Sequence, residues 1–167
     1  MDKEKKFFIY LELEPYLAQW FVHDCGGEQP VVLQKLSVER RVIEVYIQKL
    51  PPGVKPDIKD ESKVEIVLPE NRVKPPKTYN YLTKKGKDIL KRSIRNRFVI
   101  QLWNDLHRYG YIGRRRDELI YGWMETHGIE LTETNWNSIA KIYLRQHKNY
   151  LQRENYKKKS KKSSKSD

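Results

Sequence analysis

The pattern of apolar and polar positions predicts strands and short helices in the first part of the chain. Residues 7–13 are rich in β-formers, and residues 63–68 alternate polar with apolar, so each predicts a strand. Pro15 suits the first turn of a short helix. Ser37 is a suitable N-cap for another helix, whose apolar stripe continues to about residue 50.

Proline and glycine place the boundaries of this first unit. Pro51, Pro52 and Gly53 end the helix that begins after Ser37, and the apolar residues 31–33 are consistent with a further short strand. Residues 70–80 contain two adjacent prolines and predict a connector. Residues 1–69 therefore form a candidate α/β module, which we expect to serve in homodimerisation or partner contact.

Helical periodicity dominates the rest of the chain. We expect helices over residues 83–109 and 115–127, separated by a break at residues 110–113. A last helix begins after Thr132 or Thr134 and continues to about residue 153. The apolar stripe of the first of these helices is Leu90, Ile94, Phe98, Leu102, Leu106 and Tyr109.

These elements together predict an α+β fold. A small N-terminal α/β module is followed by a basic three-helix module over residues 81–156, which could be a helix-turn-helix variant. Residues 157–167 consist almost entirely of lysine and serine, and such low-complexity composition predicts a disordered tail.

Charge is distributed unevenly between the two halves. Residues 1–69 hold 10 Lys and Arg against 12 Asp and Glu, whereas residues 70–167 hold 24 against 10. The net charges of these segments are −2 and +14. Because the excess extends well beyond the lysine-rich end, the second half as a whole is predicted to bind a polyanion.

A row of cations along the helix at residues 83–109 supplies the first candidate site. Between residues 84 and 97 only Asp88 is acidic against seven basic side chains. Such a row can neutralise successive phosphates, although a solvated helix face remains the alternative. The candidate phosphate-binding residues are Lys84, Lys87, Lys91, Arg92, Arg95, Arg114, Arg115 and Arg116.

The last two helices supply the second candidate site. If they form a helix-turn-helix, the polar face of the last helix would meet base edges, where Asn can pair with adenine and Arg with guanine. The connection between these helices is longer than usual, so a three-helix bundle with a solvated polar face competes with this interpretation. Trp136 belongs to the apolar stripe and is predicted to be core. The candidate readout residues are Asn135, Asn137, Lys141, Arg145 and Lys148.

Two other binding hypotheses stay open. Tyrosines interleaved with lysine and arginine are typical of surfaces that stack unpaired bases, which keeps single-stranded DNA or RNA as an alternative ligand. A basic half can also face an acidic protein, as in an adaptor or a virion component. A salt titration of binding to duplex DNA separates these classes.

The sequence offers no catalytic constellation that we can single out. Asp57, Glu61 and Lys63 imitate a nuclease motif, but they lie too close together in a predicted loop for carboxylates that must converge on Mg²⁺. Cys25 is the single cysteine, which leaves neither a disulfide nor a thiolate zinc cluster. We expect a non-enzymatic protein without metal or cofactor, cytoplasmic and not membrane-bound.

Residues 16–27 and 118–145 carry a weak resemblance to uncharacterised small proteins of prophages and mobile elements in Bacteroidetes-type bacteria. The resemblance implies a DNA-associated accessory role and no particular site residue. Together with the charge, it favours double-stranded DNA as the partner.

Overall fold

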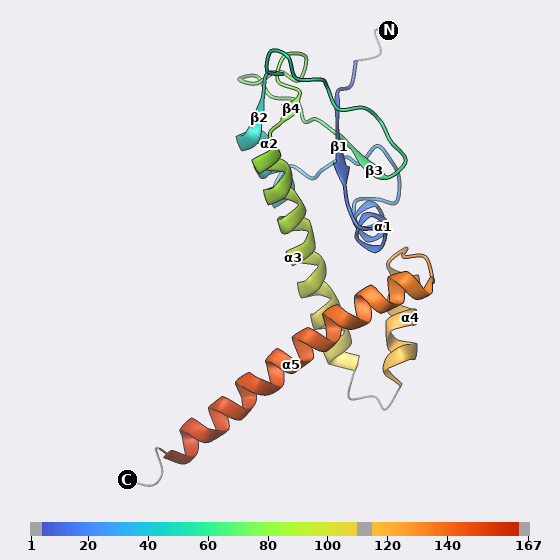
Figure 1. Cartoon of the computed structure of the whole chain (residues 1–167), viewed down its shortest axis with the longest axis vertical. Coiled ribbons are helices and arrows are strands. Elements are labelled where there is room, and N and C mark those ends of the chain that lie inside the picture. The colour runs from blue at the N-terminus through green and yellow to red at the C-terminus, as the bar shows by residue number, and fades with distance from the viewer. Residues whose placement is uncertain (1–4, 110–114, 164–167) are drawn as a thin grey trace.

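The computed structural model describes residues 5–109 and 115–163 and confirms an α+β fold (Figure 1). A sheet region with two helices lies at one end, and a helical module occupies the other. The elements in chain order are β1 (Phe8–Glu12), α1 (Pro15–Asp24), α2 (Val38–Tyr46), β2 (Ile47–Gln48), β3 (Lys63–Val67), β4 (Tyr81–Leu82), α3 (Lys84–Tyr109), α4 (Arg116–Thr126) and α5 (Glu133–Ser163).

The two predicted strands pair with each other. β1 and β3 are antiparallel, with Ile9 opposite Ile66, and both of these side chains are buried. The strand expected at residues 31–33 is reduced to a bridge between Val31 and Ile66, in which the Val31 amide donates to the Glu65 carbonyl at 2.7 Å. The sheet therefore gains a parallel contact but no third strand there.

Local signals set the first two helices. Pro15 occupies the first turn of α1, and the Ser37 hydroxyl accepts a hydrogen bond from the Arg40 amide at 3.2 Å, as an N-cap does. α2 ends at Tyr46, earlier than expected, because Ile47 and the residue after it turn extended and pair with β4.

The core is built around α3, and both halves of the chain contribute to it. Phe98 of α3 lies in this core. The centroid of its ring lies 5.2 Å from that of Tyr16 and 5.3 Å from that of Trp20, both on α1. On the other side it meets Trp123 from α4 at 5.5 Å. From Leu90 to Leu106 the predicted stripe of α3 is buried, with residues every four positions facing inward, and the side chain of Tyr109 lies outside the described part of the chain.

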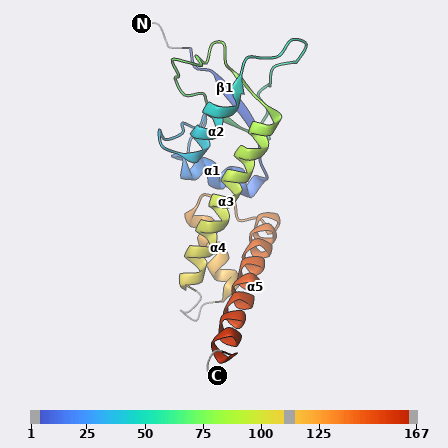
Figure 2. The ribbon, with the colours of Figure 1, turned by 90° about the vertical axis from the view of Figure 1, so that its left-hand side faces the viewer.

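α5 differs most from expectation. We predicted that it would end near residue 153 and that residues 157–167 would be disordered, but the helix continues to Ser163. Lysine is a good helix former, and Glu154 pairs with Lys157 at 3.0 Å one turn later. α5 crosses α3, and its C-terminal part extends beyond the other elements in both views (Figures 1 and 2).

Two further observations complete the fold. Within the described residues, no helix is both long enough and apolar enough to cross a membrane. The predicted break at residues 110–113 and Arg114 lie outside the described residues.

Candidate nucleic-acid interface

Several cations of the predicted row on α3 contact carboxylates from the N-terminal half. Lys87 forms an ion pair with Asp57, and Arg95 pairs with Glu14 at 3.4 Å. Lys85 lies over the ring of Tyr46, 5.9 Å from its centre. Through these contacts the cations of α3 help to pack the helix against the first part of the chain, and their charge is partly neutralised there.

Arg97 is the most deeply engaged of these cations. Its guanidinium pairs with Asp24 and, at 2.9 Å, with Glu39, whose residue is only 2% exposed. It also stacks over the Trp20 ring at 4.9 Å. Burial acts to lower the pKa of Arg97, but the hydrogen bond to Asp24 and the charge of Glu39 outweigh it and raise the pKa. Arg97 therefore serves the fold.

The outward face of α3 carries less positive charge than the sequence count suggests. Lys84 and Arg92 are exposed there, but Asp88 lies between them, and Lys91 is half-buried. At the start of α4, Arg115 and Arg116 are exposed and are followed by two acidic residues. The predicted phosphate-binding row is thus divided into small groups.

Asn135 is not placed as a readout residue. Its residue is 3% exposed, and its amide donates to the Gln19 side chain at 3.2 Å and to the Glu130 carbonyl at 3.0 Å. These bonds tie the start of α5 to α1 and to the turn before α5. A side chain so enclosed cannot reach a base, because contact with a base edge would require breaking both bonds.

The other predicted readout residues lie on the exposed face of α5. Asn137, Lys141, Arg145 and Lys148 are all exposed. In residues 5–109 and 115–163, the three cations of this set form no ion pair. Trp136 on the opposite side is half-buried and stacks against Tyr121 at 6.0 Å, in keeping with its predicted place in the apolar stripe.

The extension of α5 over residues 154–163 adds five lysines that the sequence had placed in a disordered tail. From Lys141 onwards α5 carries nine basic side chains against one acidic residue, Glu154. The signal that could have revealed the extension is the absence of both glycine and proline after Gly128. The nine cations are Lys141, Arg145, Lys148, Arg153, Lys157, Lys158, Lys159, Lys161 and Lys162.

A groove between α3 and α5 brings the two predicted sites together. It has a volume of about 350 Å³, and Arg95 from α3 and Arg145 from α5 both line it. The remaining lining residues are Asn96, Val99, Ile100, Ile142 and Gln146. Among the described residues that line it there is no carboxylate, so the local charge favours an anion.

An aromatic cluster holds α5 against α3 beyond this groove. The ring of Trp103 lies 5.8 Å from that of Tyr143 and 5.7 Å from that of Tyr150. His107 meets Tyr150 at 4.8 Å. Among the tyrosines predicted to stack on bases, Tyr150 packs in this cluster and Tyr121 stacks against Trp136. Tyr156, by contrast, is 76% exposed near the C-terminal end of α5.

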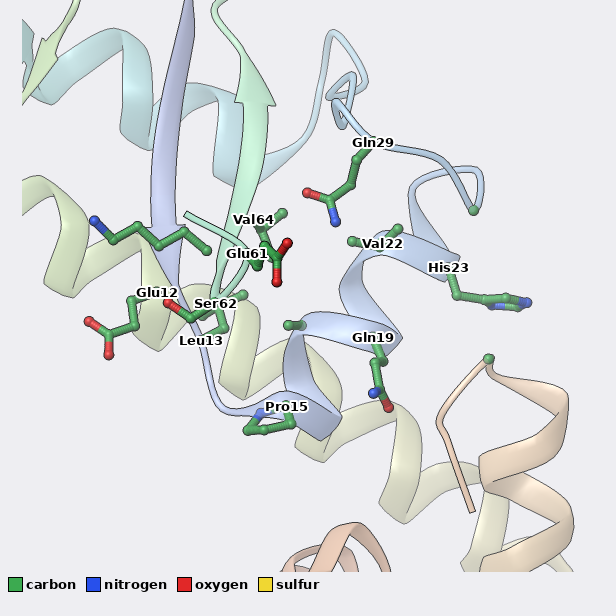
Figure 3. Close-up of a pocket in the computed structure, with 14 residues that line it drawn as sticks. Glu12, Leu13, Pro15, Gln19, Val22, His23, Gln29, Glu61, Ser62 and Val64 are labelled. Carbon is green, nitrogen blue, oxygen red and sulfur yellow. The ribbon is translucent and has the colours of Figure 1, made fainter. Parts of the chain in front are cut away.

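A larger pocket of about 650 Å³ lies where α1 approaches the ends of β1 and β3 (Figure 3). Glu12 and Glu61 line it together with Leu13 and Val22, and Lys63 is its sole lysine or arginine. The two carboxylates disfavour phosphate there. The nucleic-acid interface is therefore better sought on the α3–α5 side.

Comparison with known proteins adds no relative. No protein-family model matches the chain, and neither curated proteins nor solved structures yield a match.

Proposed function

We propose that the protein binds double-stranded DNA without catalysing a reaction on it, and that α5 is its principal contact. The observation that carries this proposal is the run of nine cations along α5 from Lys141 to Lys162, against the one carboxylate of Glu154. Residues 141–163 form a helical rod about 33 Å long, close to one turn of B-DNA. A helix fits the major groove, and cations that neutralise phosphates release condensed counterions.

The predicted residues take different parts in this proposal. Lys141, Lys148 and the lysines of the extension hold phosphates, and Lys84, Arg92, Arg115 and Arg116 on α3 and α4 supply additional contacts. Asn137 and Arg145 are the exposed side chains suited to base edges. An accessory or regulatory role in a phage or mobile element, in the cytoplasm, agrees with the resemblance of residues 118–145.

Dimerisation through the N-terminal half remains a prediction. Leu36, Val38 and Val45 are exposed apolar side chains at and near α2, and their relative exposures are 99%, 62% and 57%. Such side chains are available to a second copy. Light scattering of the full chain measures whether a dimer forms.

The test of DNA binding is a salt titration with a fluorescent duplex of generic sequence, followed by anisotropy. The logarithm of the association constant should fall steeply and linearly with the logarithm of salt concentration. Absence of binding at about 50 mM salt would overturn the proposal and favour a protein partner for the basic half.

A further inference from the structure

The groove between α3 and α5 has features that a rod of cations for duplex DNA does not need. Three of its lining residues are aliphatic, Val99, Ile100 and Ile142, and we call them its aliphatic floor. Ile100 is 61% exposed although the rest of the lining is charged or polar. Asn96 and Gln146 from the two helices place amide groups beside this floor. The lining therefore combines apolar contact with hydrogen-bond donors and acceptors.

The charges of the groove are available to an incoming anion. Arg145 is exposed and forms no ion pair within residues 5–109 and 115–163. Arg95 pairs with Glu14 at 3.4 Å, and both side chains are about half exposed, so a phosphate can replace that carboxylate at little cost. Guanidinium groups thus flank an aliphatic floor from both helices.

Size selects the form of nucleic acid that can enter. A volume of about 350 Å³ is at the small end of ligand pockets and cannot admit a duplex. An unpaired base can lie on Ile100, with its edge toward the amides and its phosphates toward the arginines. A paired base is excluded, because its faces are covered by the stack and its partner occupies one edge.

We propose that this groove binds unpaired nucleotides at the end of a DNA duplex, while the extension of α5 follows the adjoining duplex. The inference rests on the proposed function and changes one part of it: Arg145 contacts the phosphate of the unpaired nucleotide instead of a base edge of the duplex, and the cations of α5 beyond Arg145 hold the duplex. Arg153 lies eight residues further along α5, about 12 Å from Arg145 along the helix axis, so the duplex contact begins close to the groove.

The experiment compares two labelled DNA probes with the full chain by anisotropy. One is a blunt duplex of about two helical turns, and the other adds a short unpaired overhang. The overhang probe should bind about fivefold more tightly, as expected for a single base contact. Ile100→Asp should abolish this preference, because the new carboxylate repels phosphate and removes the apolar floor.

Asn104→Asp is the matched control. It adds the same charge to an exposed position on α3 one turn beyond Ile100, outside the groove lining, and should keep the preference. Both variants change exposed side chains, and circular dichroism verifies that they remain folded.

The outcomes separate the two proposals. Equal binding of both probes by the unmodified protein overturns the groove assignment and leaves duplex binding intact, whereas no binding of either probe removes both. Equal loss of preference in both variants also overturns the groove assignment. A third outcome would assign the groove to a protein partner. In that case the overhang gives no preference, an acidic peptide with aliphatic side chains binds the unmodified protein, and Ile100→Asp abolishes binding of the peptide.

Discussion

α3 and α5 are both long, cation-rich helices, with 26 and 31 residues, but their charges have different environments. Three cations of α3, Lys87, Arg95 and Arg97, pair with carboxylates from the first half of the chain. α5 has one carboxylate beyond residue 140, and its basic face points to solvent. A count of positive residues therefore does not indicate which of them are available to a ligand.

The largest expected effect concerns Arg97. Arg97→Ala should lower the free energy of unfolding by about 3 kcal/mol, because Glu39 would remain buried without its cation. Chemical denaturation measures this change. Arg92→Ala removes an exposed cation of the same helix and should change the stability by less than about 0.5 kcal/mol. Equal effects of the two substitutions would contradict the structural role of Arg97.

The extension of α5 should dominate DNA affinity. Simultaneous substitution of Lys157, Lys158 and Lys159 by Ala should weaken duplex binding about 30-fold and reduce the salt slope by nearly three, with stability unchanged. The matched control replaces three α3 cations, Lys84, Lys91 and Arg92. A larger loss of affinity in this control than in the α5 variant would reverse the comparison between the helices.

Substitutions of two asparagines near the start of α5 should distinguish a residue that stabilises the fold from one that contacts DNA. Asn135→Ala removes the hydrogen bonds to Gln19 and Glu130 and should cost about 1.5 kcal/mol of stability. Asn137→Ala alters an exposed side chain and should leave thermal unfolding unchanged. If Asn137 contacts bases, its substitution changes site preference in a binding selection. Unchanged thermal unfolding of Asn135→Ala would refute its structural assignment.

The smallest effect concerns the packing of α3 against the first half. A Cβ atom at Gly86 would lie 2.6 Å from the Cβ of Tyr46, so Gly86→Ala should lower stability by about 1 kcal/mol despite the better helix propensity of alanine. Gly122→Ala in α4 meets no atom within 4 Å and should raise stability by a similar amount. Differential scanning calorimetry tests for these opposite signs, and a stabilising Gly86→Ala would disprove the tight contact.

Local signals in the sequence predicted much of the fold. The alternation in residues 63–68, the proline that begins α1 and the cap at Ser37 each act over a few residues, and the structure confirms them. The pairing of β2 with β4 was missed, because a strand of two residues has no periodicity to detect.

For the candidate site, the exposure of Lys141, Arg145 and Lys148 follows from helical spacing opposite the Trp136 stripe. The burial of Asn135 does not, because its partner Gln19 is distant in the chain, and polar residues are mostly exposed.

The amino-acid sequence by itself determined where most helices and strands form and that the second half is basic, since these properties depend on neighbouring residues and on composition. Only the tertiary structure decided which cations are neutralised, because Arg97 and Glu39 are 58 positions apart and meet only when α2 packs against α3. The tertiary structure likewise decided that Arg95 and Arg145 line the same groove, because their proximity depends on where α5 crosses α3.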